Sequence, residues 1–210
     1  MRVLIGCERS GVVREAFRKR GHDAWSCDLV PAEDKSRYHI QGDLRTVLPM
    51  SNMWDMMIAF PDCTYLCNSG ALRLYTGGKK INGPDSKRWE QMYKAAYFFK
   101  EILNTPIPKV CVENPIMHGY AREIIGARPT QTIQPYNFGA DASKRTGLWL
   151  RGLPELVNTA YVEPRMVDGK PRWANQTDGG WNKLAPSPTR GIERARTYQG
   201  IAEAMAEQWG

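Results

Sequence analysis

Short apolar runs alternate with amphipathic segments along most of the chain. The runs at 2–7, 54–60 and 109–115 are nearly continuous, which is the pattern of strands buried on both faces. Residues 10–21 and 84–104 instead repeat apolar side chains at helical spacing. Strands that alternate with helices in this way predict a doubly wound α/β fold, with a mostly parallel sheet covered by helices on both faces.

Further segments extend this order. Residues 22–29 and 144–152 are predicted as strands, residues 38–44 as a short strand or a turn, and residues 191–210 as one closing helix. The length of 210 residues suits a single domain over 1–210.

Two regions break the alternation. Residues 67–89 are glycine-rich and basic, and this composition predicts a mobile loop. Residues 151–191 contain several Pro and Gly and little periodicity, and predict an irregular insert. The pattern leaves open whether the insert is an ordered flap or a poorly ordered segment.

The net charge says more about possible binding partners than the overall composition does. Hydrophobic residues make up 42% and charged residues 24%, which is ordinary for a globular chain. The net charge of +7 favours an anionic partner, most often nucleic acid, although a merely basic surface is the alternative. The first apolar run is too short and too soon interrupted for a signal peptide, and no run reaches membrane-span length. A cytoplasmic location is therefore expected, without a membrane partner, and the oligomeric state stays open.

The five cysteines do not form a disulfide or zinc pattern. Cys7, Cys27 and Cys111 lie in or beside apolar runs and are expected to be reduced core thiols. Cys63 and Cys67 are four residues apart, a spacing that places both on one face of a helix. The three histidines are scattered, so no metal is expected.

Polar residues follow the predicted strands at their carboxyl ends, the edge of an open α/β sheet where ligands bind. These residues are Gly6, Cys7, Glu8, Asp28, Asp43, Asp62, Cys63, Glu113 and Asn114. Their recurrence at one edge predicts a functional site there.

The first three of these strand ends suggest a cofactor. A glycine-containing turn lets backbone amides approach a ligand, and here it comprises Gly6, Cys7, Glu8, Ser10 and Gly11. Asp28, after the second strand, is placed to bind a ribose diol, and Asp43 to meet an adenine edge. The dinucleotide fingerprint is absent, so an adenosine-containing cofactor without a pyrophosphate, S-adenosylmethionine, is the prediction. The alternative is that Asp28 and Asp43 merely cap turns.

Cys63 and Glu113 could perform covalent chemistry at the same edge. A thiol becomes nucleophilic beside positive charge or a helix N-terminus, and Arg73, Lys79, Lys80 and Arg145 are candidate cations. A thiolate together with a carboxyl group that holds a proton can attack an electron-poor heterocycle.

At this point the chain resembles the DNA cytosine-5 methyltransferases, in particular the short versions carried by phages and prophages. The resemblance covers about three quarters of the chain. Its elements are the turn "IGCERSG", Gly42-Asp43-Leu44, Pro61-Asp62-Cys63, Glu113-Asn114-Pro115, "DASKRTGLWL" with Arg145, and the closing "YQGIAEAM".

The resemblance implies a methyltransferase-type Rossmann-like fold and a mechanism. Cys63 would add to carbon 6 of cytosine, Glu113 would hold the amine edge and protonate the ring nitrogen, and Arg145 would help to hold the base. Leu44 and Pro61 would join the residues that bind S-adenosylmethionine. The substrate would be DNA, either a duplex with the cytosine flipped out or a single strand.

The resemblance also assigns DNA contacts. The loop over 68–87 corresponds to the family's loop that closes over DNA, and its basic residues suit phosphates. The implied DNA-binding residues are Arg73, Lys79, Lys80, Lys87 and Asn114. Cys67 is expected to pack beneath this loop and not to act as the nucleophile.

Several positions depart from the family pattern. Asp62 replaces a Pro, Thr64 a Gln and Pro115 a Val, while Asp141 and Ser143 replace a Gln and an Arg. A carboxylate at Asp62 is expected to raise the pKa of the Cys63 thiol. The insert is also too short for the family's target-recognition domain, so site specificity is expected to be short or relaxed. Two other interpretations stay open: a non-catalytic relative that binds nucleic acid or a partner protein, and a methyltransferase for another base or nucleotide.

Overall fold

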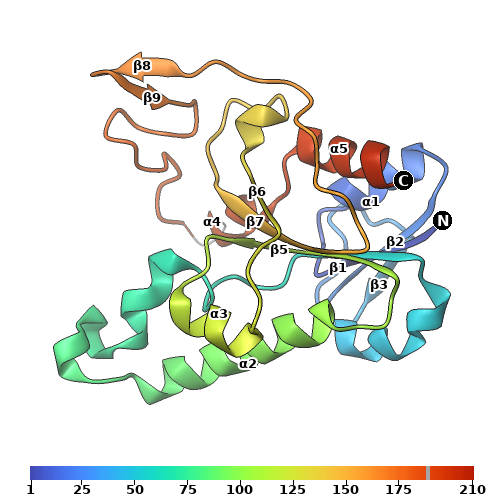
Figure 1. The fold of residues 1–210 in the computed structure, drawn as a ribbon, viewed down its shortest axis with the longest axis horizontal. Helices are drawn as coiled ribbons and strands as arrows, with labels where there is room; N and C mark the ends of the chain where they lie inside the picture. The colour runs from blue at the N-terminus through green and yellow to red at the C-terminus, as the bar shows by residue number, and fades with distance from the viewer. Residues whose placement is uncertain (188–189) are drawn as a thin grey trace.

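The computed structural model describes residues 1–187 and 190–210. A central sheet runs through the molecule (Figure 1). Its strands are β1 (Arg2–Gly6), β2 (Asp23–Asp28), β3 (His39–Gln41), β4 (Met56–Ala59), β5 (Lys109–Pro115), β6 (Gln131–Ile133) and β7 (Thr146–Arg151). The helices are α1 (Val12–Lys19), α2 (Ser86–Leu103), α3 (Gly119–Ile125), α4 (Arg190–Ala195) and α5 (Gln199–Trp209).

The strands lie in the order β3-β2-β1-β4-β5-β7-β6. The pairs β1–β2, β1–β4, β2–β3 and β4–β5 are parallel, and β7 runs antiparallel to both β5 and β6. A parallel sheet whose order reverses at β1, with one antiparallel strand inserted before the edge, is the Rossmann-like fold of S-adenosylmethionine-dependent methyltransferases. The predicted doubly wound, mostly parallel fold is confirmed.

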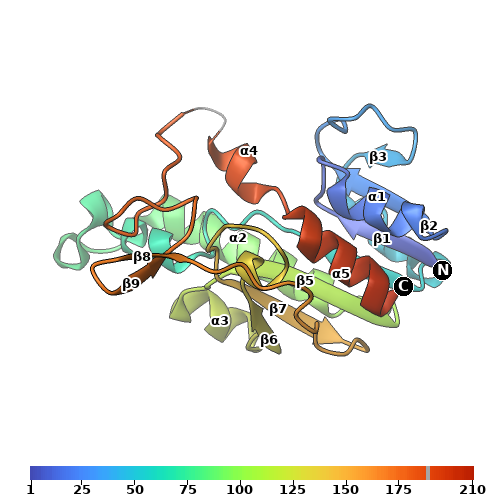
Figure 2. The same ribbon diagram turned by 90° about the horizontal axis from the view of Figure 1, so that it is seen from above.

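Helices cover both faces of the sheet. α1 and α5 lie together on one face, and α2 and α3 lie on the other (Figures 1 and 2). Neighbouring residues of a strand face opposite sides, so each strand serves both cores. Leu4 and Met57 pack toward α2, whereas Ile5 and Ile58 pack toward α1 and α5.

The closing segment forms two helices, so the predicted single helix over 191–210 is wrong. Tyr198 has an extended backbone, which separates α4 from α5. Apolar side chains of α5, including Ile201, Met205 and Trp209, pack on the sheet. Gly200 allows close approach, because a Cβ there would lie 1.8 Å from the carbonyl oxygen of Phe138.

The basic loop consists of short 3-10 turns over Asn68–Leu74, Thr76–Gly78 and Lys80–Asn82. It is tied to the helix layer, because the Tyr75 and Tyr120 hydroxyls are hydrogen-bonded at 2.7 Å. The mobility expected of this loop stays a prediction.

The insert contains a small hairpin, β8 (Arg165–Val167) paired with β9 (Lys170–Arg172). Trp173, which follows β9, stacks on Tyr136 with ring centroids 4.2 Å apart. Residues 188–189 of the predicted insert lie outside the described residues. Within the described residues, the insert therefore contains a hairpin and a ring stack.

The insert also explains two departures from the family pattern. The Asp141 carboxylate accepts a hydrogen bond from the Ala174 backbone N–H at 2.8 Å. The backbone of Ser143 exchanges two hydrogen bonds with the Asn175 side chain, both 3.0 Å long. Asp141 and Ser143 therefore anchor the insert to the segment before β7. Among the described residues, no helix is long and apolar enough to cross a membrane.

Candidate functional site

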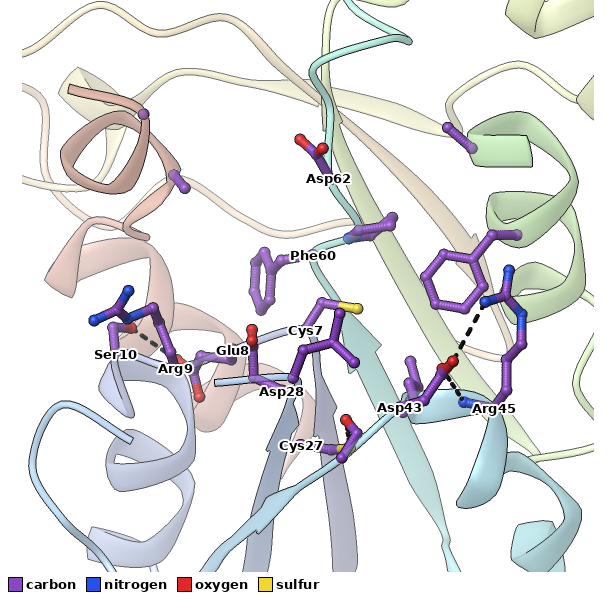
Figure 3. A pocket seen from close by; sticks show the side chains of 18 of the residues that line it. Cys7, Glu8, Arg9, Ser10, Cys27, Asp28, Asp43, Arg45, Phe60 and Asp62 are labelled. Carbon is purple, nitrogen blue, oxygen red and sulfur yellow. Dashed lines mark hydrogen bonds and ion pairs between the residues drawn. The ribbon is translucent and has the colours of Figure 1, made fainter. Parts of the chain in front are cut away.

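A cavity of about 630 Å³ opens at the carboxyl ends of β1, β2 and β4. Figure 3 shows side chains from these strand ends and from the facing helix around it. The predicted cofactor residues that line it are Cys7, Glu8, Ser10, Asp28, Asp43, Leu44 and Pro61. The structure thus brings together polar strand ends that lie far apart in the sequence.

The two predicted glycines shape the turn but do not line the cavity. A Cβ on Gly6 would lie 2.6 Å from Cδ2 of Leu44, so a larger residue there would require the Leu44 side chain to move. Gly11 has φ of +74°, in the left-handed region that favours glycine, and begins α1 as its N-cap. Their role is therefore in the backbone.

Glu8 caps α1 from inside the turn. Its carboxylate accepts hydrogen bonds from the backbone N–H groups of Val13 at 2.7 Å and Arg14 at 3.2 Å. Burial of the side chain, which is only 5% exposed, raises the pKa of Glu8 to about 7 against these hydrogen bonds. Glu8 thus holds the turn that forms one wall of the cavity.

Asp28 and Asp43 cap turns and also line the cavity. One Asp28 oxygen accepts from the Val30 N–H at 3.1 Å. Asp43 accepts from the Arg45 N–H at 2.9 Å and pairs with its guanidinium at 3.5 Å. Both aspartates cap turns and line the cavity, so the turn-cap alternative and the cofactor prediction do not exclude one another.

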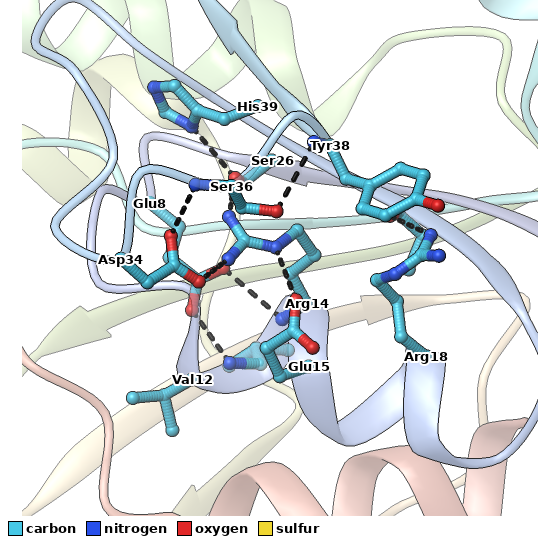
Figure 4. A network of polar contacts seen from close by, with 12 residues as sticks. Glu8, Val12, Arg14, Glu15, Arg18, Ser26, Asp34, Ser36, Tyr38 and His39 are labelled. Atoms are coloured by element: carbon cyan, nitrogen blue, oxygen red, sulfur yellow. Dashed lines mark hydrogen bonds and ion pairs between the residues drawn. The ribbon is translucent and has the colours of Figure 1, made fainter.

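A buried arginine holds the loop that follows β2 (Figure 4). The fully buried Arg14 donates to the Ser26 hydroxyl at 2.7 Å and pairs with Asp34 in that loop. Ser26 is also hydrogen-bonded to Nδ1 of His39, at 2.8 Å. This network positions Leu29 and Glu33, which line the cavity.

The cavity has a wall that sequence reasoning missed. Glu33 pairs with Arg9 at 3.2 Å and also with Arg196, which follows α4. Other lining residues not foreseen include Arg45, Phe60, Tyr65, Phe98 and Thr197. Phe60 directly follows the buried β4, which was a usable signal. The others reach the cavity only through tertiary packing.

Beside this cavity, the chain after β4 forms a turn that begins at Cys63. The backbone N–H groups of Leu66 and Cys67 both donate to the Cys63 carbonyl oxygen at 3.0 Å. The Asp62 carboxylate accepts from the Thr64 backbone N–H at 2.9 Å and from its hydroxyl at 2.6 Å. Asp62 and Thr64, two departures from the family pattern, thus cap the turn together.

The environment of Cys63 lowers the pKa of its thiol. The main cause is a hydrogen bond with the Cys67 thiol, and Lys144 acts in the same direction. Burial, Glu113 and Asp62 oppose them. The expected unfavourable effect of Asp62 is therefore present, but other groups outweigh it. The pKa of Cys67 is raised by the same hydrogen bond.

Glu113, on β5, is half-buried, and burial raises the pKa of its carboxyl group. Lys144 and a hydrogen bond with the Thr146 hydroxyl oppose this rise. A small cavity of about 20 Å³ is lined by Glu113, Lys144 and Thr146 together with Phe60. Glu113 thus retains its proton more readily than an ordinary glutamate. It lies near Cys63, whose thiol loses its proton more readily than an ordinary cysteine.

Lys144 occupies the position expected for Arg145. Side chains alternate along an extended segment, so Lys144 and Thr146 share a face. Lys144 is half-buried and acts on both Cys63 and Glu113, whereas Arg145 is exposed. The position of Arg145 does not support its predicted role in holding the base.

The predicted DNA contacts divide into two groups. The four exposed ones are Arg73, Lys79, Lys80 and Lys87, all in or next to the basic loop. Asn114 is fully buried, and its amide donates to the Pro115 carbonyl at 2.5 Å. Asn114 is therefore not part of the surface that could meet DNA. Within the described residues, no three His, Cys, Asp or Glu side chains gather as metal ligands.

No family model matches the chain, and neither does any curated protein. Among solved structures, it is similar to a putative DNA modification methyltransferase encoded in an Escherichia coli prophage, with 13% identity and a TM-score of 0.45, over 71% of this chain and 46% of that one. It is similar to the Entamoeba histolytica methyltransferase EhMeth, with 14% identity and a TM-score of 0.48, over 78% of this chain and 58% of that one. It is also similar to the Schizosaccharomyces pombe Dnmt2 methyltransferase, with 15% identity and a TM-score of 0.39, over 74% of this chain and 51% of that one.

The chain thus spans about half the length of these methyltransferases. At such identities and TM-scores, the likeness does not extend to activity or substrate. The chain's own strand order has a cavity at its switch point, and the turn that carries Cys63 lies beside that cavity. This geometry is a doubly wound fold of the S-adenosylmethionine-dependent methyltransferase type.

Proposed function

We propose that this protein transfers a methyl group from S-adenosylmethionine to carbon 5 of cytosine in DNA through a covalent Cys63 adduct. The observation that carries the proposal is the proximity of Glu113 and Lys144 to Cys63, which directly follows the cavity residues Phe60, Pro61 and Asp62. A depressed thiol pKa beside a raised carboxyl pKa is the pair of shifts that nucleophilic attack with acid assistance requires.

The cavity fits the cofactor by its donor set. Asp28 and Asp43 offer carboxylate oxygens to ribose hydroxyls and to an adenine amino group, and Phe60 and Phe98 offer apolar surface. A volume of about 630 Å³ suits a ligand of that size. When bound, S-adenosylmethionine supplies an electrophilic methyl group.

The residues beside the cavity then have distinct tasks. The Cys63 thiolate attacks carbon 6 of a cytosine, while Glu113 donates its proton to the ring nitrogen. This addition makes carbon 5 nucleophilic, and that carbon accepts the methyl group. Loss of the proton from carbon 5 to water, departure of the Cys63 sulfur and return of the ring-nitrogen proton to Glu113 then restore the aromatic ring. Lys144 balances the negative charge of the thiolate and the carboxylate.

The basic loop is the proposed DNA contact. Arg73, Lys79, Lys80 and Lys87 are exposed cations on one segment, and phosphates are the complementary groups. The target base must leave the helix stack to approach a thiol at a strand end, so the substrate is a duplex with a flipped cytosine or a single strand.

The test is incubation of the protein with methyl-labelled S-adenosylmethionine and mixed-sequence DNA, followed by nucleoside analysis. We expect the label in 5-methylcytosine, and none when Cys63→Ala replaces the wild type. Label on an exocyclic amine or on another base would support the different-substrate interpretation. A wild type that binds DNA but transfers no label would support the non-catalytic one.

A further inference from the structure

The insert presents one tryptophan to solvent. The Trp181 side chain is 78% exposed, more than any other aromatic side chain in the described part of the chain. An exposed tryptophan forgoes the free energy that burial of its large apolar ring would give. Trp173 in the same insert is 8% exposed and stacks on Tyr136, so this short segment buries one tryptophan and leaves the other outside.

Hydrogen bonds fix the turn that carries Trp181. The Thr177 backbone N–H donates to the Trp181 carbonyl oxygen at 2.8 Å, and the Trp181 N–H donates to the Thr177 hydroxyl at 3.1 Å. The Gly180 N–H also donates to the Thr177 carbonyl oxygen at 2.9 Å. Gln176 and Asn182, which flank the turn, form an antiparallel bridge. Trp181 is thus held on a closed turn and not on an open loop.

Two arginines of the hairpin brace the same turn. Arg165 pairs with the Asp178 carboxylate at 2.6 Å and donates to the Gln176 carbonyl oxygen at 2.9 Å. Arg172 donates to the Asp178 carbonyl oxygen at 2.9 Å. Gly180, with φ of +86°, leaves room for the Arg172 guanidinium, because a Cβ there would lie 3.2 Å from its Cζ. Both guanidinium groups are therefore engaged within the insert and hold the turn in one geometry.

The surroundings of Trp181 are polar and basic. Its neighbours in the sequence are Gly180, Asn182 and Lys183. Lys183 and Lys170 are exposed, and neither side chain forms an ion pair with a described residue. Surfaces that dock another protein gather apolar side chains around an aromatic one, whereas sites for single-stranded nucleic acid combine exposed aromatic rings with free cations. The chemistry around Trp181 is therefore that of a surface for a nucleic acid strand.

The turn lies at the end of the molecule where the proposed reaction takes place. The β8–β9 hairpin and the basic loop lie at the same end in both views, the end toward which β5 runs (Figures 1 and 2). Asn175, which directly precedes Gln176, exchanges hydrogen bonds of 3.0 Å with the backbone of Ser143, the neighbour of Lys144. A DNA strand that runs from the basic loop past Lys144 would therefore continue toward Trp181.

We propose that Trp181 is a stacking platform for an unpaired base of single-stranded DNA, with Lys170 and Lys183 in contact with the adjacent phosphates. The inference rests on the proposed function for its partner, and it selects the single strand from the two substrate forms left open there. A base inside a duplex is covered on both faces by its neighbours, so only an unpaired base offers a free face to an indole ring. Every base has such a face, so this contact carries little sequence preference.

The experiment measures affinity by fluorescence anisotropy, without cofactor, for a labelled pyrimidine strand that cannot pair with itself. Trp181→Leu keeps an apolar side chain but removes the planar ring, and it should weaken binding at least about fivefold, the lower range for loss of one stacked base. Trp181→Phe should retain most of the affinity. Tyr97→Leu, at an exposed aromatic position on α2, is the matched control and should bind like the wild type.

Two further measurements separate stacking from charge. On a strand of abasic sugar-phosphate units, the wild type and Trp181→Leu should bind equally, because no base is present to stack. Lys183→Ala should reduce the slope of log affinity against log salt by about 0.7, the value for one phosphate of a single strand. Trp181→Leu should leave that slope unchanged, because it removes no charge.

Four results would overturn the inference: unchanged affinity in Trp181→Leu, an equal loss in Trp181→Phe, an equal loss on the abasic strand, or an equal loss on a blunt-ended duplex that contains the same strand. Thermal unfolding of each variant monitors folding. Since the readout needs no methyl transfer, the expected losses in a protein that makes no 5-methylcytosine would count against the proposed function and not against this contact. Formation of 5-methylcytosine together with unchanged affinity in Trp181→Leu would count against this contact alone.

Discussion

At the scale of single residues, the site depends on which of two neighbouring groups faces the interior. Lys144 and Arg145 are adjacent and both cationic, yet only Lys144 acts on Cys63 and Glu113. The resemblance implies Arg145, which is exposed, and its role in holding the base stays a prediction. A shift by one residue exchanges the two faces of a strand.

The identity of the nucleophile can be tested by trapping. DNA containing 5-fluorocytosine should form a stable covalent complex with the wild type in the presence of S-adenosylmethionine, because fluorine blocks the final proton loss. Cys63→Ser should abolish the complex, since a hydroxyl is far less ionised than a thiol at neutral pH. Cys67→Ser should retain it. Denaturing gel electrophoresis measures the complex, and a trapped Cys63→Ser protein would refute the assignment.

Asp28 can be tested as a cofactor ligand. If its carboxylate binds the ribose, Asp28→Ala should weaken S-adenosylmethionine binding by about 1–3 kcal/mol, the usual cost of leaving a polar partner unpaired. Asp23→Ala is the matched control, because Asp23 lies at the opposite end of the same strand. Isothermal titration calorimetry gives both affinities. Equal affinity of wild type and a folded Asp28→Ala would leave Asp28 as a turn cap only.

At the scale of elements, the strength of the apolar pattern decided which predictions succeeded. α2 and the buried strands β1, β4 and β5 have strong patterns and were predicted. β6 has three residues and α3 has seven, too few for periodicity to distinguish them from loops. The break at Tyr198 between α4 and α5 is a backbone feature with no residue signal such as proline.

The basic loop acts as one element, and its charges can be removed together. Changing Lys79, Lys80 and Lys87 to Ala should weaken DNA binding for all sequences alike and reduce the slope of log affinity against log salt by about three. The expected reason is loss of phosphate contacts, which carry no sequence information. Fluorescence anisotropy at several salt concentrations measures both effects.

The control removes equal charge elsewhere, with Lys19, Arg20 and Lys35 changed to Ala on the exposed surface around α1. These substitutions should leave the salt slope nearly unchanged. A loop variant that lost affinity for one sequence but kept its slope would mean that the loop reads bases.

At the scale of the whole molecule, stability and the site share a buried carboxyl group. Glu8 binds its proton more tightly in the folded protein, where its pKa is about 7, than in the unfolded chain, where a glutamate has its ordinary pKa of 4.5. The folded state therefore gains stability from this group below about pH 4.5 and loses that contribution as pH rises to about 7. The Glu8→Gln variant should lack this loss, because its amide does not titrate.

Chemical denaturation of both proteins across this pH range measures the difference in the free energy of unfolding. Glu15→Gln is the control, since Glu15 lies in the same first turn of α1 but is partly exposed. A wild type and a Glu8→Gln variant with parallel pH dependence would show that the Glu8 pKa is not raised.

The sequence by itself determined the doubly wound sheet, because apolar periodicity depends only on local residue order and strand burial. It also placed Asp28, Asp43 and Cys63 at one edge, since parallel strands end on the same side. Only the tertiary structure decided how Glu33 meets Arg196, how Asp141 anchors the insert and how Lys144 approaches Glu113. These contacts join segments distant along the chain or depend on the face a side chain takes, and local pattern carries neither kind of information.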